Sequence, residues 1–143
     1  CFDYEDFVAE AIASALDLLS ARVIATLAQA ENGTLKELAS ALRKRWKRLL
    51  EVTRVLHEAG DLNVTLANAT LYLEAFGHII ISWIWLEQAL AAQKSAKPDS
   101  DFYAGKLQAA HWFFRHELPR TDAQLDLLAA LDTTTLDMQD AWF

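Results

Sequence analysis

Glycine and proline are scarce in this sequence of 143 residues, which contains four glycines and two prolines. A fold built from many short strands needs frequent turns, and these two residue types make most of them. Their scarcity argues against a strand-rich fold and favours a few long helices. Leucine, alanine, glutamate, lysine, arginine and glutamine are frequent, and they are strong helix formers. We expect an all-α fold.

Cysteine is nearly absent, because Cys1 is the only one. A single thiol excludes a disulfide within the chain and is typical of a reducing compartment, so we expect a cytoplasmic protein. The first residues are acidic and already follow a helical pattern, without the basic leader and apolar block of a signal peptide. A chain that begins at cysteine inside such a pattern is expected to be a fragment of a larger protein.

Long apolar runs are also missing. The most apolar stretch, HIIISWIWL at 78–86, is shorter than the roughly 20 apolar residues that cross a bilayer, so we expect a central buried helix and no membrane span. Hydrophobic residues make up 53% of the chain and charged residues 23%, which is typical of a globular domain with one core. The net charge of -7 gives no general attraction for nucleic acid or anionic lipid.

Helical periodicity predicts four long amphipathic helices and two shorter segments. The long helices fall at about 3–29, 34–59, 63–94 and 101–117, a short fifth helix at 121–131, and a last turn within 136–142. The short connections predict an antiparallel up-down four-helix bundle in which sequential neighbours are in contact. We expect the fifth helix to close one end of the bundle. Residues 1–143 then form a single domain.

Local signals predict where these helices begin and end. Two pairs, Thr34–Glu37 and Thr121–Gln124, have the spacing of a capping box, in which each side chain satisfies a free N–H of the first turn. Gly60 is expected to end the second helix, and Asp61 or Asn63 to cap the third.

Apolar stripes predict the buried faces of the second and third helices. On the second helix the stripe consists of Leu35, Leu38, Leu42, Trp46, Leu49, Val52 and Leu56, and on the third of Leu66, Ala69, Leu73, Phe76, Ile80, Ile84 and Ala91. The middle of the third helix has no polar face, so it must be covered on more than one side.

The residues do not assemble a catalytic or metal-binding constellation. Glu74 and His78 lie four apart on one helix face, whereas a di-metal bundle needs two carboxylate–histidine pairs at a spacing of three and two further glutamates. The serines lie within helices without a glycine elbow, and the glycines are scattered singly instead of forming a phosphate loop. We therefore assign no catalytic, cofactor-binding or metal-binding residue.

The basic run RKRWKR at 43–48 has two interpretations. It can be a phosphate-binding surface, which would make the chain a stand-alone module for nucleic acid or another polyanion. It can also be a solvated face, or one side of a salt-bridged contact with an acidic partner, because helical periodicity spreads consecutive cations around the helix. Arg43 and Lys47 share one face and are candidate interface residues.

Aromatic residues cluster on the third and fourth helices. Trp83 and Trp85 are two apart and point to different faces, and Trp112 to Phe114 cover most of their helix. One part of each cluster can fill the bundle. The other part either meets something outside the bundle, including a second copy, or is covered by the fifth helix and the tail. Trp83, Trp85, Trp112 and Phe114 are the candidate interface residues.

Two stretches, 68–92 and 101–119, carry more than a generic bundle pattern. They contain Tyr72-Leu73-x-x-Phe76-Gly77 and Phe102-Tyr103-x-Gly105-Lys106-Leu107, and the second ends at Leu118-Pro119. On these motifs the chain resembles the C-terminal helical domain appended to large bacterial FAD-dependent acyl-CoA dehydrogenases. The resemblance extends from about residue 60 to 120.

The resemblance implies a parent oxidoreductase of fatty acid metabolism, which uses FAD and a glutamate base to oxidise an acyl-CoA to a 2-enoyl-CoA. It implies that the flavin site and the base lie upstream, and neither maps onto this chain. The chain would be an accessory domain that is not catalytic alone. It would pack on the upstream core, contribute to a homo-oligomer, or border the acyl-CoA entrance, and meet acyl-CoA only through the parent enzyme.

Overall fold

The computed structural model describes residues 4–95, 97 and 100–142, with the backbone alone for 4–9, 11 and 12. Its elements are α1 (Tyr4–Ala30), α2 (Lys36–Glu58), α3 (Leu62–Leu66), α4 (Ala69–Gln93), α5 (Asp101–His116), α6 (Arg120–Ala129) and a final 3₁₀ turn (Asp140–Trp142). This all-helical order confirms the predicted fold class.

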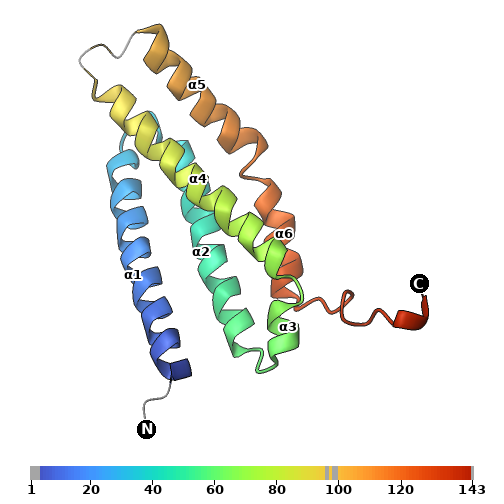
Figure 1. Ribbon diagram of the computed structural model, residues 1–143. Helices are drawn as coiled ribbons and strands as arrows, with labels where there is room; N and C mark the ends of the chain where they lie inside the picture. Colours follow the sequence, from blue (N-terminus) through green and yellow to red (C-terminus); the bar gives the residue numbers. More distant parts are fainter. Residues whose placement is uncertain (1–3, 96, 98–99, 143) are drawn as a thin grey trace.

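The helices form an up-down bundle with α4 at its centre (Figure 1). Sequential neighbours are in contact as predicted, from α1 to α2, α2 to α4 and α4 to α5. The sequence predicted that the short helix α6 closes one end of the bundle, and this prediction is wrong. Helix α6 continues the course of α5 along α4 and also packs against α2. Leu118, which is fully buried, anchors the joint between α5 and α6, so these two helices together occupy the fourth position of the bundle.

The predicted apolar stripe of α2 is the best-packed part of the core. Every one of its members, from Leu35 to Leu56, is buried, and Leu42, Leu49 and Val52 are completely so. This burial confirms the prediction. The stripe could be predicted because the opposite face of α2 is strongly charged, which leaves only one side on which the apolar side chains can be covered.

The predicted buried face of α4 is only partly correct, because Phe76 and Ile80 pack against the core whereas other members of the stripe are exposed. Leu73 and Ile84 from that stripe are 67% and 42% exposed, and Leu66, just before α4, is 55% exposed. The residues that fill the core are instead Ala75, Ile79, Ser82, Trp83, Leu86, Ala89, Leu90 and Ala92. Because α4 is apolar around most of its circumference, its periodicity does not distinguish the inward side. The small side chains of Ala75 and Ala89 let neighbouring helices approach closely on that side.

The length and composition of α4 have a second consequence. Among the residues that the structure describes, α4 is the one helix long and apolar enough to cross a membrane by those two measures. The central helix of a helical bundle passes the same test. The absence of a membrane span stays a prediction.

The predicted third helix is divided in two at Ala67 and Asn68. Before the break, Gly60 ends α2 with a left-handed φ of 71°, as predicted, and the Asp61 carboxylate caps α3 by accepting from Asn63 N at 2.8 Å. At the break, the Asn68 side-chain amide donates to the carbonyl of Asp132 at 2.8 Å. The division therefore frees Asn68 to hold the start of the C-terminal segment.

Neither predicted capping box forms. Leu35 occupies the N-cap position of α2 without a side-chain cap, and Thr34 Oγ1 instead accepts from Gln93 Nε2 at 2.5 Å. Thr121 lies inside α6 and donates to the Leu118 carbonyl at 2.7 Å. Both threonines have the predicted spacing, but tertiary packing places them one or two residues away from a cap.

Candidate interaction surfaces

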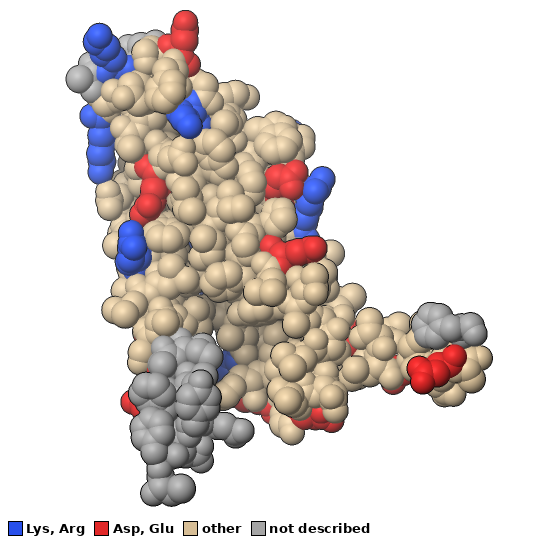
Figure 2. Space-filling model, viewed as in Figure 1, with Lys and Arg blue, Asp and Glu red and all other residues tan. Residues whose placement is uncertain are grey.

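The outward side of α4 forms a continuous apolar surface, which we call the α4 face. Leu73, Ile81 and Ile84 lie on it, with exposed fractions of 67%, 44% and 42%. They are two residues away from the buried Ala75, Ile79 and Leu86, and therefore point to the opposite side of the helix. Figure 2 shows that the centre of this view is largely free of charged side chains, which gather toward its edges. Apolar surfaces of this kind usually mark an interface.

Aromatic residues continue the α4 face toward α5. Trp85 is partly buried against the core, with Lys106 Nζ 5.7 Å from its ring centroid. The same ammonium group lies 5.7 Å from the ring of Phe102, which is 66% exposed. Sequence reasoning missed Phe102 and Ile81 as surface residues. Ile81 was missed because α4 is apolar around most of its circumference, and Phe102, near the start of α5, because its spacing gave no sign that it is exposed.

Trp112 lies on a different part of α5, beside α2. It is 53% exposed and stacks on the His116 ring with centroids 5.2 Å apart. Both rings line a groove of about 340 Å³ that reaches Leu38 and Ala41 on α2. This candidate residue is therefore on the surface, as the sequence interpretation requires.

Trp83 and Phe114 are buried, with 7% and 6% exposure. The indole Nε1 of Trp83 donates to Thr26 Oγ1 at 2.8 Å, and the Arg22 guanidinium lies 5.4 Å from the indole centroid. These contacts join α4 to α1. Both aromatic side chains fill the core of this chain, so we leave them out of the interaction surface.

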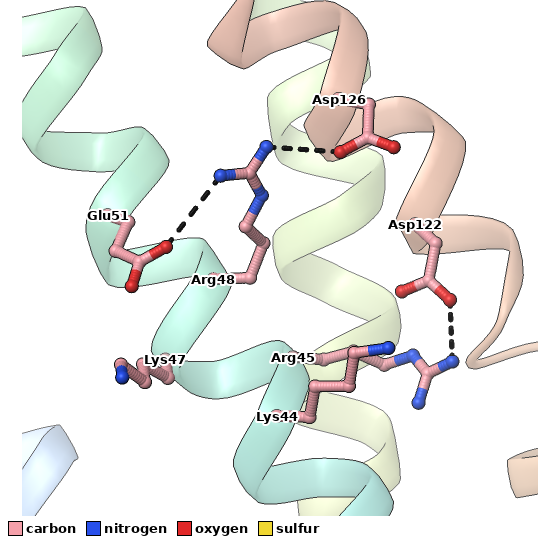
Figure 3. A pocket seen from close by; sticks show the side chains of 7 residues that line it. All are labelled: Lys44, Arg45, Lys47, Arg48, Glu51, Asp122 and Asp126. Atoms are coloured by element: carbon pink, nitrogen blue, oxygen red, sulfur yellow. Dashed lines mark hydrogen bonds and ion pairs between the residues drawn. The ribbon is translucent and has the colours of Figure 1, made fainter.

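The basic run of α2 faces the acidic side of α6 (Figure 3). Arg45 pairs with Asp122 at 2.7 Å, and Arg48 pairs with Asp126 at 3.1 Å and with Glu51 at 3.7 Å. The arginines thus make a salt-bridged contact with an acidic partner, and that partner is a helix of the same chain. These pairs explain why α6 packs against α2 instead of closing an end.

The two candidate interface cations on α2 differ in their surroundings. Arg43 is ion-paired with Glu31, just after α1. Lys47 is exposed and lines the shallow pocket beside Arg48 and Glu51, where its side chain points away from α6 (Figure 3). Most of the guanidinium groups of the run are therefore used within the bundle, which lowers the charge available for a polyanion.

The Glu74–His78 pair makes hydrogen bonds within the bundle. His78 Nδ1 lies 2.8 Å from the Glu74 backbone carbonyl, and Nε2 lies 3.5 Å from the Glu117 carboxylate. The Glu74 carboxylate accepts from Gln124 Nε2 at 3.1 Å. In the described part of the chain no three histidine, cysteine, aspartate or glutamate side chains come together as a metal site would need.

Comparison with known proteins gives one family. The family model described as acetyl-CoA dehydrogenase C-terminal like matches residues 8–139. No curated protein and no solved structure matches the chain. The matched region includes α2 to α6, all but the first four residues of α1, and both motifs on which the resemblance was based. The chain belongs to the acetyl-CoA dehydrogenase C-terminal-like family.

Proposed function

We propose that this chain is the C-terminal accessory and assembly domain of an FAD-dependent acyl-CoA dehydrogenase. The parent enzyme would oxidise an acyl-CoA to a 2-enoyl-CoA in the cytoplasm, with the flavin and the catalytic base in an upstream core. Family membership supports the association with such a core. The role left to this domain is to bind the core and to contribute to the assembly of the subunits.

The observation that carries this proposal is the α4 face. A soluble single-domain protein normally covers its most apolar helix, whereas here Leu73, Ile81 and Ile84 stay substantially exposed. Interface cores are enriched in aromatic and aliphatic side chains and depleted of charge. The α4 face with Trp85 and Phe102 has this composition, so we place the contact with the upstream core there.

Hydroxyl-radical footprinting tests this placement on two proteins, the chain alone and the complete protein encoded around it. We expect Ile81 and Ile84 to be labelled in the chain alone and protected in the complete protein. Leu62, which is 71% exposed on α3, is the control and should be labelled equally in both. Equal labelling of the α4 face in the two proteins would contradict the placement.

The enzymatic part of the proposal needs a separate measurement. The complete protein should carry a bound flavin with its characteristic absorbance, and an acyl-CoA should bleach that absorbance as the flavin is reduced. A complete protein that binds no flavin, or whose flavin is reduced by none of a series of acyl-CoA chain lengths, would refute the assignment to an acyl-CoA dehydrogenase.

A further inference from the structure

The C-terminal segment Asp132–Trp142, which we call the arm, leaves the bundle beside α3 and extends away from it (Figure 1). It carries three large apolar side chains with little cover. Leu136, Met138 and Trp142 are 44%, 52% and 64% exposed. A tail that only has to stay in solution has no need of such residues, so their exposure calls for a partner.

The departure of the arm is structurally defined. Leu131, at its root, has a φ of 52°, and in the described residues it is the only residue besides glycine with a positive φ. A leucine in this left-handed region is strained, and such strain persists only when the surroundings fix it. Here the Leu131 side chain packs against the core, and the next carbonyl, of Asp132, accepts from Asn68. The arm therefore leaves in a fixed direction.

The first part of the arm also holds its own shape. Thr133 Oγ1 donates to the Asp137 carboxylate at 3.0 Å, and Leu136 N donates to the Thr133 carbonyl at 2.8 Å. This turn presents the apolar residues that follow it at a distance from the bundle. A segment ordered in this way loses less conformational entropy when it binds a partner.

An apolar groove lies beside the root of the arm. It encloses about 360 Å³ between α2, α3 and α4, and is lined by Thr53, Leu56, His57, Thr65, Leu66, Ala69, Tyr72 and Leu73. Leu66 and Leu73 on its wall are 55% and 67% exposed. The arm contacts the Ala67–Asn68 connection through Asp132 and Thr135, and Leu66 and Ala69, on either side of this connection, line the groove.

We propose that the arm of one chain binds in this groove on a second copy of the chain, so that two copies exchange arms reciprocally. In a two-fold dimer both copies use the same surface. Because each chain carries both an arm and a groove, each arm can bind the groove of the other copy. The arm points away from its own bundle (Figure 1), which favours the neighbour's groove over its own.

The charges of the two parts are compatible. Every ionisable side chain of residues 132–142 is an aspartate, at 132, 137 and 140. The described residues lining the groove include no carboxylate, and His57 is their one potential cation. An acidic, apolar arm therefore enters a groove that does not repel it. The groove shares only Leu73 with the α4 face, and Ile81 and Ile84 lie outside the groove, so failure of the exchange and failure of the proposed contact with the upstream core are distinguishable.

Sedimentation of the 143-residue chain tests the exchange. We expect a dimer whose dissociation constant rises at least about tenfold in Trp142→Ser and in a truncation after Asp132, the loss typical of a buried aromatic anchor. Leu66→Glu in the groove should weaken the dimer to a similar degree. The matched control is Phe102→Glu, a 66% exposed position on α5, which should leave the dimer intact. Circular dichroism checks that each variant stays helical.

Photo-crosslinking from position 142 identifies the groove that the arm occupies. Benzoylphenylalanine replaces Trp142 in an unlabelled chain, which is mixed with a ¹⁵N-labelled chain without the crosslinker. Crosslinked pairs that join an unlabelled arm to a labelled peptide from residues 53–73 are the expected result. The proposal would be overturned by a monomeric chain or by a dimer that persists without the arm. It would also be overturned if crosslinks joined only unlabelled peptides or lay only outside this groove.

Discussion

At the scale of single residues, Arg45 distinguishes between the two interpretations of the basic run. Its side chain is 12% exposed and pairs with Asp122 at 2.7 Å. Arg54, in contrast, is 65% exposed and pairs with Glu58 one turn away. An ion pair of a largely buried arginine contributes more to the free energy of unfolding than an exposed pair does, because solvent screens the exposed charges.

We therefore expect Arg45→Ala to lower the free energy of unfolding by about 1.5 kcal/mol or more, and Arg54→Ala by less than about 0.5 kcal/mol. Urea unfolding followed by circular dichroism measures both. If the two variants were equally stable, the contact between α2 and α6 would contribute no more than a surface pair, and the basic run would again be available for a polyanion.

Trp83 and Trp112 give a second comparison between residues of one type. Trp83→Phe removes the hydrogen bond to Thr26 inside the core, and we expect it to lower the free energy of unfolding by about 1–2 kcal/mol. Trp112→Phe, at a position 53% exposed, should change it by less than about 0.5 kcal/mol. Thermal unfolding of both variants checks this, and a larger effect at Trp112 would contradict the assignment of the buried and exposed tryptophans.

The same pair shows the limit of the sequence at this scale. A spacing of two residues established that Trp83 and Trp85 point to different faces of one helix. It could not determine which one points inward, because both faces of α4 are apolar. The partner that fixes the choice is Thr26, which lies 57 residues away in the sequence and has no local relation to either tryptophan.

At the scale of helices, α2 and α4 differ in how well their sequences predict which face is buried. The buried face of α2 was predicted completely, because charged residues on the other side left no alternative. The buried face of α4 was predicted only in part. Phe76 and Ile80 pack against the core as expected, but Leu73 and Ile84, which are exposed, continue as regular a stripe as Ile79 and Leu86 do. In the absence of a polar face, the inward side depends on which neighbours fit, and the small Ala75 and Ala89 mark that side.

A matched pair of substitutions on α4 tests which side is inward. Ile79 is completely buried and Ile84 is 42% exposed. We expect Ile79→Ala to lower the free energy of unfolding by about 2–4 kcal/mol, through lost burial and the cavity that remains, and Ile84→Ala by less than about 1 kcal/mol. Chemical denaturation provides both values. The reverse order would restore the face that the sequence stripe predicted.

At the scale of the whole molecule, the bundle could be predicted and its interaction surfaces could not. The long helices, their up-down order and their sequential contacts follow from periodicity and short connections. The course of α6 did not follow, because it depends on ion pairs such as Arg45–Asp122 that join distant segments. The α4 face was also hidden, since exposed apolar residues such as Leu73 and Ile84 form the same periodic stripe in the sequence as core residues do.

This property of the α4 face gives a prediction about the chain in solution. We expect the double substitution Ile81→Lys and Ile84→Lys to raise the solubility of the isolated chain and to reduce its binding of a hydrophobic dye, because it replaces exposed apolar surface with charge. The melting temperature should stay within about 3 °C, since neither side chain fills the core. Ile79→Lys, which places a charge in the core, should unfold the chain under the same conditions. If the double variant unfolds as well, α4 is covered on its outer side even in the isolated chain, and the surface assigned to the upstream core does not exist.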